Sequence, residues 1–288
     1  MTVYLRNGLS KKSHSEVPIQ TLEIGIVNLM PNRQETEEQF ISLLSQNEQN
    51  VALSFFYPET HQFRYSSAAV VKSHYETLSN GLKQRMDGWI VTGAPVEKLP
   101  FEMVDYWHEL QAVITSFSEQ KVPVIYECWA AQAALYQQYG FQKALRARKL
   151  SGVFAADTIL SKSHLIYGFG AGGLFRMPQS RHTDLVLPQS GLPSELEVIA
   201  SAPEVGPMVL ADLLTNAVFV TGHPEYTQYT LDREYQHDYQ RGLVVDPPHN
   251  YYLNDSKEQV NYSWLTTSRQ FYRNWVGQVM QKKVVKNL

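Results

Sequence analysis

Apolar runs alternate with amphipathic stretches through the first half of the chain. Residues 22–29 (LEIGIVNL) form a β-branched apolar run that stops at Met30-Pro31, which predicts a buried strand. From Thr36 onward the apolar positions fall on one helical face. The same criteria predict strands at 51–58, 88–93 and 122–127, and helices at 74–86, 101–117 and 129–139. This alternation indicates a doubly wound α/β fold with a mostly parallel sheet flanked by helices.

The second half of the chain is less regular. Shorter strands, several of them antiparallel, are predicted near 151–168 and at 196–200, 207–212 and 217–222, and helices at about 230–241 and 263–283. Residues 1–20 are polar and lack periodicity, so we expect an N-terminal arm there. No repeat or linker divides the remainder, and we interpret 21–288 as a single domain.

Composition limits the partners. With 25 Lys and Arg against 28 Asp and Glu the net charge is −3, so no basic field is available for nucleic acid. No apolar run approaches the roughly 18 residues of a membrane span, and the N-terminus lacks the apolar core of a signal peptide. These features predict a cytoplasmic protein whose partners are small molecules rather than nucleic acid or membrane.

The chain has one cysteine, Cys128. It cannot form an intramolecular disulfide, and zinc sites that need paired cysteines are excluded, so we expect no metal centre. Cys128 lies between a predicted strand and a predicted helix, at the carboxyl edge of a parallel sheet and before a helix N-terminus. That setting lowers the pKa of a thiol and supplies donors for an oxyanion. A buried structural cysteine is the alternative interpretation of the same position.

A second candidate motif, Gly222-His223-Pro224-Glu225, follows the strand predicted at 217–222. In an extended segment His223 and Glu225 point to the same side, as a general base and its orienting partner require. A hydrogen-bonded loop histidine would have the same sequence. The pairing with a strand-end cysteine strengthens the catalytic interpretation, because cysteine nucleophiles use a histidine distant in sequence.

Other motifs are weaker. The glycines at 168, 170, 172 and 173 lack the strand and helix of a dinucleotide-binding unit and indicate a surface turn. Ser180-Arg181-His182 follows a proline and is interpreted as a solvated loop. No P-loop and no G-x-S-x-G motif occurs, which argues against a P-loop NTPase and a standard serine hydrolase.

Seven short segments, in order along the chain, carry a more specific combination of residues. They are NLMP (28–31), TGAPVE (92–97), DYW (105–107), CWAAQAAL (128–135), KLSGVF (149–154), SRH (180–182) and TGHPEY (221–226). Together with Asn274-Trp275 they resemble the homoserine O-succinyltransferase/O-acetyltransferase family.

The resemblance implies a flavodoxin-like fold related to class I glutamine amidotransferases, usually as a homodimer. It implies ping-pong chemistry in which Cys128 takes an acyl group from acyl-CoA as a thioester and an amino-acid hydroxyl then attacks it. His223 would act as general base and acid, and Glu225 would orient it. The backbone N–H of Trp129, at the helix start, would stabilise the oxyanion.

The resemblance also assigns residues that contact the substrates. Lys149 and Ser180 match positions that contact the amino acid or the acyl intermediate. Glu97 matches the position where acetyl-specific members carry glutamate and succinyl-specific members carry glycine. A carboxylate there would fill space and repel the free carboxylate of a succinyl group, which favours acetyl-CoA.

Two positions depart from the family pattern. His237 stands where the family carries an arginine that clamps the substrate α-carboxylate, and the loss of a bidentate guanidinium is not conservative. This favours the shorter acceptor serine over homoserine. Asn32 stands where the family usually has lysine.

The sequence therefore predicts an O-acetyltransferase that uses acetyl-CoA as co-substrate, holds no permanent cofactor, and acetylates L-serine or L-homoserine in cysteine or methionine biosynthesis. The alternatives are a homoserine O-succinyltransferase that uses succinyl-CoA, and a glutamine amidohydrolase-like hydrolase built on the same residues. A catalytically silent binding protein with a structural Cys128 is a third possibility.

Overall fold

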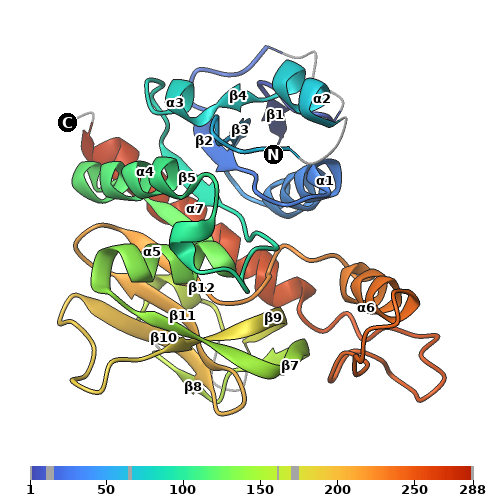
Figure 1. Ribbon diagram of the computed structural model, residues 1–288. Helices are drawn as coiled ribbons and strands as arrows, with labels where there is room; N and C mark the ends of the chain where they lie inside the picture. Colours follow the sequence, from blue (N-terminus) through green and yellow to red (C-terminus); the bar gives the residue numbers. More distant parts are fainter. Residues whose placement is uncertain (1, 11–15, 64–66, 161, 170–174, 287–288) are drawn as a thin grey trace.

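The computed structural model describes residues 2–10, 16–63, 67–160, 162–169 and 175–286 (Figure 1). The strands are β1 (Val3–Leu5), β2 (Leu22–Val27), β3 (Val51–Tyr57), β4 (Glu76–Thr77), β5 (Gly88–Val91), β6 (Val124–Glu127), β7 (Gln142–Ala155), β8 (Thr158–Ile159), β9 (Arg176–Val186), β10 (Leu196–Ala202), β11 (Gly206–Asp212) and β12 (Ala217–Val220). The helices are α1 (Arg33–Leu44), α2 (Ser67–His74), α3 (Leu78–Gly81), α4 (Trp107–Gln120), α5 (Trp129–Tyr139), α6 (Thr230–Gln240) and α7 (Leu265–Lys286), with 3₁₀ turns η1 (Phe101–Met103) and η2 (His164–Ile166).

A mixed sheet of ten described strands forms the centre of the protein. Its order is β1-β3-β2-β5-β6-β12-β11-β10-β8, and β4 also pairs with β3. The pairs from β1 to β12 are parallel, whereas β11, β10 and β8 are added antiparallel. The parallel strands are apolar on both faces, and every residue of β3 is buried. The predicted mostly parallel sheet with antiparallel additions is confirmed.

Helices cover both faces of this sheet. On one face α1 and α7 pack through residues such as Phe40 and Trp275. On the other face α3, α4 and α5 pack through residues such as Trp107 and Leu135. Two cores on opposite faces of one sheet are the signature of a doubly wound fold, and they fix the strand ends that carry the site.

A second, two-stranded sheet lies beside the main one. β7 and β9 pair antiparallel and form a long ribbon, drawn in green and yellow in Figure 1. The range predicted near 151–168 contains the last part of β7 and all of β8. β7 begins earlier, at Gln142, where charged residues on exposed positions interrupt any apolar run. The solvated loop predicted at 180–182 is wrong: these residues belong to β9, and the Arg181 side chain is 2% exposed.

The N-terminal residues are not simply an arm. β1 pairs with the outer edge of β3, and the Asn7 amide exchanges two hydrogen bonds with the backbone of Phe55, of 2.9 and 2.6 Å. The prediction of an arm over 1–20 is therefore wrong for these residues. A domain boundary at residue 20 would cut β1 off from the sheet to which it belongs. A three-residue edge strand is too short for a periodicity signal.

Two predicted helices start or end elsewhere. The helix predicted at 74–86 is replaced by the end of α2, by β4 and by α3, because Thr77 is extended and accepts a hydrogen bond from the Asn80 N–H, 3.4 Å away, as a helix cap. The helix predicted at 101–117 begins as η1 and becomes α4 only at Trp107, since Val104 is extended.

The glycine-rich run at 168–173, predicted to be a surface turn, lies mostly outside the described residues, because residues 170–174 are not described. Gly168 is described, and its φ of 86° is one that glycine adopts readily. Among the described helices, none combines the length and apolar character that a membrane span needs.

Candidate active site

Cys128 forms a sharp turn between β6 and α5. Its φ and ψ are 47° and −113°, a conformation that costs a non-glycine residue about 1–3 kcal/mol. The Cys128 N–H donates to the carbonyl oxygen of Val220, the last residue of β12, at 2.7 Å. The cysteine is thus held at the carboxyl ends of two neighbouring parallel strands, where doubly wound folds place their ligands.

His223 and Glu225 follow β12 and lie against this turn. The backbone N–H of His223 donates to the Pro178 carbonyl of β9 at 2.9 Å, and a side chain at Gly222 would collide with that same carbonyl. His223 Nδ1 lies 2.7 Å from Glu225 Oε1, and the two side chains are 4% and 2% exposed. The carboxylate therefore fixes the orientation of the imidazole.

The imidazole of His223 also interacts with the Cys128 thiol. Burial alone would lower the pKa of His223, but Cys128 and Glu225 outweigh burial and raise that pKa well above the value of a free imidazole. His223 is therefore placed to give up or take a proton directly beside Cys128. The ring of Tyr226 stacks on His223 at 4.2 Å and limits its movement.

Gly93, just beyond β5, lies against both Cys128 and His223. A Cβ at position 93 would lie 3.2 Å from both the Cβ of Cys128 and the Cε1 of His223. Close approach, rather than backbone conformation, therefore favours glycine at this position.

The helix that follows Cys128 supplies backbone donors. Trp129 is the first residue of α5, so its N–H has no partner within the helix. Its indole is fully buried and packs against Phe101 and Tyr106 at 6.0 Å between ring centroids, which anchors the start of the helix. The N–H is available to stabilise negative charge that develops beside the thiol.

Glu97 is partly buried and is tied to β9. Its Oε2 accepts the backbone N–H of His182 at 2.8 Å, and its own carbonyl accepts Lys143 Nζ at 2.7 Å. Burial raises the pKa of Glu97, while the His182 N–H and the charges of His223 and Lys149 oppose the rise. Glu97 is thus within electrostatic reach of the group around Cys128.

A network of charges lies on the outer side of the cysteine. The Ser180 carbonyl is 3.9 Å from the Cys128 sulfur, and the Ser180 hydroxyl donates to Glu234 at 2.5 Å. Lys149 Nζ lies 3.3 Å from Glu234 and 3.1 Å from Asp238. Burial alone would lower the pKa of Lys149, but the two carboxylates outweigh burial and raise it.

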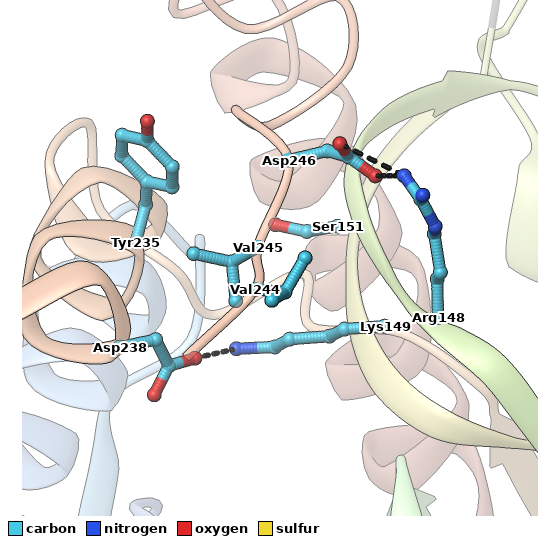
Figure 2. Close-up of a pocket in the computed structure, with 8 residues that line it drawn as sticks. All are labelled: Arg148, Lys149, Ser151, Tyr235, Asp238, Val244, Val245 and Asp246. Carbon is cyan, nitrogen blue, oxygen red and sulfur yellow. Dashed lines mark hydrogen bonds and ion pairs between the residues drawn. The ribbon is translucent and has the colours of Figure 1, made fainter. Parts of the chain in front are cut away.

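Figure 2 shows the hollow next to this network, between α6 and the ribbon. Lys149 reaches across to Asp238, and Arg148 pairs with Asp246 on the far wall. Val244 and Val245 lie between these two ion pairs.

His237 lies apart from the buried residues. It is on α6, its side chain is 67% exposed, and its Nδ1 is 3.6 Å from Asp238 Oδ1. It is not among the residues that line the hollow of Figure 2.

The structure brings together Cys128, His223 and Glu225. Sequence reasoning missed the central position of Glu234, which also accepts the hydroxyl of Tyr226 at 2.5 Å. Only its place in the same EYQHD segment as His237 could have drawn attention to it. Within the described ranges, no group of three or more His, Cys, Asp or Glu side chains is arranged to hold a metal ion.

The chain is similar to known proteins over nearly its whole length. Homoserine O-acetyltransferases are similar over most of the chain: that of Thermotoga petrophila is 36% identical over 280 residues, covering 96% of this chain and 90% of its own, and that of Bacillus subtilis is 36% identical over 270 residues, covering 93% and 88%. A glutamine amidotransferase of Thermotoga maritima shares the fold, with a TM-score of 0.59 at 10% identity, over 90% of this chain and 98% of its own.

A family model described as homoserine O-succinyltransferase matches residues 7–285. The chain therefore belongs to the homoserine O-succinyltransferase family, as the resemblance of its seven segments predicted.

Proposed function

We propose that the protein is an acyltransferase that moves an acetyl group from acetyl-CoA, through a thioester on Cys128, to the side-chain hydroxyl of L-homoserine or L-serine. The observation that carries this proposal is the contact series from Cys128 to His223 to Glu225, buried at the carboxyl ends of β6 and β12. The product, an O-acetyl amino acid, would serve methionine or cysteine biosynthesis.

In the first half-reaction the Cys128 thiolate attacks the thioester carbonyl of acetyl-CoA. The tetrahedral oxyanion lies near the N–H of Trp129 at the start of α5. Collapse of this intermediate breaks the bond to CoA, whose sulfur leaves with the proton of the His223 imidazolium. The acetyl group is then held on Cys128, and His223 is neutral.

In the second half-reaction the acceptor hydroxyl attacks the thioester while His223 takes its proton. Collapse releases Cys128 as a thiolate and restores the imidazolium. Glu225 keeps the proton on Nδ1 of the neutral ring, so that Nε2 is free to act as the base.

The charges of the outer network fit an amino-acid acceptor. Glu234 and Asp238 are carboxylates that attract an α-ammonium group, and Lys149 is a cation for an α-carboxylate. Glu97 supports acetyl rather than succinyl transfer, because its partly buried carboxylate would repel a second carboxylate on the acyl group.

The names of the relatives support homoserine as the acceptor. Serine is favoured by one observation: His237 replaces the arginine of the family pattern, and its side chain is directed largely to solvent. Steady-state assays with each pairing of acetyl- or succinyl-CoA with serine or homoserine decide among these substrates. Dominant succinyl transfer would contradict the role of Glu97.

The covalent step has its own test. After mixing with acetyl-CoA and no acceptor, intact-mass measurement is expected to show one added acetyl group on the wild type and none on Cys128→Ala. Turnover by Cys128→Ala should fall at least about 10⁴-fold. Release of ammonia from glutamine without any acetyl adduct would instead support the amidohydrolase alternative. A silent protein would show neither activity.

A further inference from the structure

Glu127 is a buried acid directly before the nucleophile, and the acyl transfer derived above does not use it. It is the last residue of β6, and its side chain has no exposed surface. Its Oε1 accepts the hydroxyl of Tyr272, which reaches down from α7. Its Oε2 is buried and has no hydrogen-bond partner. A buried carboxyl oxygen without a partner is costly and calls for an explanation.

Glu225 likewise has one carboxylate oxygen without a hydrogen-bond partner. Its Oε1 is occupied by His223 Nδ1, whereas its Oε2 is buried and also unpartnered. The two glutamates belong to one buried cluster. Glu127 pairs in register with Val220, the last residue of the strand that leads to His223 and Glu225, and the charge of Glu225 acts on both Glu127 and Tyr272. Two carboxyl groups thus lie close together away from water, each with one oxygen unaccounted for.

Two ionised carboxylates cannot be held together in such a place without strong repulsion. Burial raises the pKa of Glu127 well above its usual range, and the charge of Glu225 raises it further. The Tyr272 hydroxyl and the His223 charge oppose this rise. The titratable groups that face Glu127 are Tyr272 from α7, His223 and Glu225 from the segment after β12, and the adjoining Cys128.

We propose that Glu127 is a positioning residue that remains protonated and donates a hydrogen bond from its Oε2 to Oε2 of Glu225. Both unpartnered oxygens are then satisfied by one proton. Glu225 keeps the negative charge. Its Oε2 accepts the hydrogen bond from Glu127, and its Oε1 holds His223. Tyr272 orients the donor in turn. The inference rests on the proposed roles of Cys128, His223 and Glu225.

The test is the rate of Cys128 alkylation by iodoacetamide as a function of pH, followed by intact mass, in wild type, Glu127→Gln and Glu127→Leu. Glutamine is neutral and can donate through its amide, so Glu127→Gln should keep both the rate at pH 7 and the midpoint. Leucine removes the donor and leaves Glu225 unsupported, so the rate at pH 7 should fall about tenfold. Glu119→Gln, on the exposed side of α4, is the matched control.

Two outcomes would overturn the proposal. If the midpoint of Glu127→Gln moves by about one pH unit, Glu127 carries a charge in the wild type. If folded Glu127→Leu reacts as fast as the wild type, Glu127 positions nothing. Neither measurement needs acetyl-CoA or an acceptor, so a failure of the proposed transfer is distinguishable from a failure of this inference.

A second measurement decides the protonation state even if Glu127→Leu does not fold. The infrared difference between wild type and Glu127→Gln at pH 7 should contain the C=O band of a protonated carboxylic acid. A carboxylate band in its place would show that Glu127 is ionised and would refute the proposal.

Discussion

The inner and outer halves of the site are built from different parts of the fold. The inner half, with Cys128, His223 and Glu225, comes from the ends of β6 and β12 in the central sheet, and it is buried. The outer half, with Lys149 and His237, comes from the β7–β9 ribbon and α6, where side-chain exposure rises from 16% to 67%. Figure 1 shows the ribbon and α6 beside the sheet rather than within it.

Under the proposed function, we expect this difference to separate reactivity from selectivity. The inner residues are fixed by strand register and by packing on both faces of a sheet, so we expect a change there to alter whether acyl transfer occurs at all. The outer residues are held by a few ion pairs around a hollow, so we expect a change there to alter which molecule reacts. The predictions below test this division, beginning with the inner half.

After the loss of Cys128 itself, the largest effect should follow from His223→Asn. Since Cys128 and Glu225 raise the pKa of His223, its imidazole stays protonated to a higher pH than a free imidazole does, and we expect this charge to activate Cys128. The wild-type alkylation rate should therefore stay high as pH falls from 8 to 6. An isolated thiol with a pKa near 8.5 is almost fully protonated at pH 6, so the variant should react about 100-fold more slowly there.

His108→Asn, on the exposed side of α4, is the matched control for alkylation and should behave like the wild type. Equal rates for His223→Asn and the wild type at pH 6 would show that the histidine does not activate the thiol.

Next in size is Glu97→Gly. Removing the carboxylate opens space and ends the repulsion, so the ratio of kcat/KM for succinyl-CoA to that for acetyl-CoA should rise about 10- to 100-fold. Glu97→Gln keeps an acceptor for the His182 N–H but loses the charge. If this ratio rises in both variants, the charge of Glu97 is the cause. If it rises only in Glu97→Gly, the size of the side chain is the cause. An unchanged ratio in both variants would contradict the specificity role of Glu97.

A smaller loss is expected for Gly93→Ala. The new Cβ would lie 3.2 Å from Cys128 and from His223, so one of them must shift by a few tenths of an ångström. Because productive geometry tolerates little displacement, kcat/KM should fall about tenfold with little change in the melting temperature. Gly277→Ala on α7, where an added Cβ meets no atom within 4 Å, should be fully active. A fully active Gly93→Ala would show that the inner half is not tightly fixed.

The smallest effect belongs to His237→Arg in the outer half. A guanidinium on this largely exposed position should raise the homoserine-to-serine ratio of kcat/KM by about threefold, because exposed charge pairs contribute little. Gln236→Arg adds the same charge at the neighbouring exposed position and should leave the ratio unchanged. An unchanged ratio in His237→Arg would show that this departure does not affect acceptor choice.

The same division explains what the sequence could predict. The strands at 22–27, 51–57, 88–91 and 124–127 lie within their predicted ranges, because each is buried on both faces and leaves a continuous apolar run. The ribbon gave no such run, since its strands carry charged residues on exposed positions, and β1 was too short to show a pattern. Only pairing with distant segments makes these residues strands.

The site divides in the same way. The meeting of Cys128 and His223 follows from topology, because both stand just after parallel strands and parallel strands end at one edge. The central position of Glu234 does not, since it depends on how α6 lies against the ribbon. Glu127 was hidden for another reason: in sequence it is only the last residue of a strand, and its importance comes from a partner on α7.

The backbone conformation of Cys128 sets activity against stability at one position. A glycine at 128 would adopt a φ of 47° without a Cβ penalty, so Cys128→Gly should relax the turn while removing the proposed acyl carrier. Screening this protein for thermal resistance alone would therefore tend to enrich inactive sequences at the residue that is proposed to carry the acyl group.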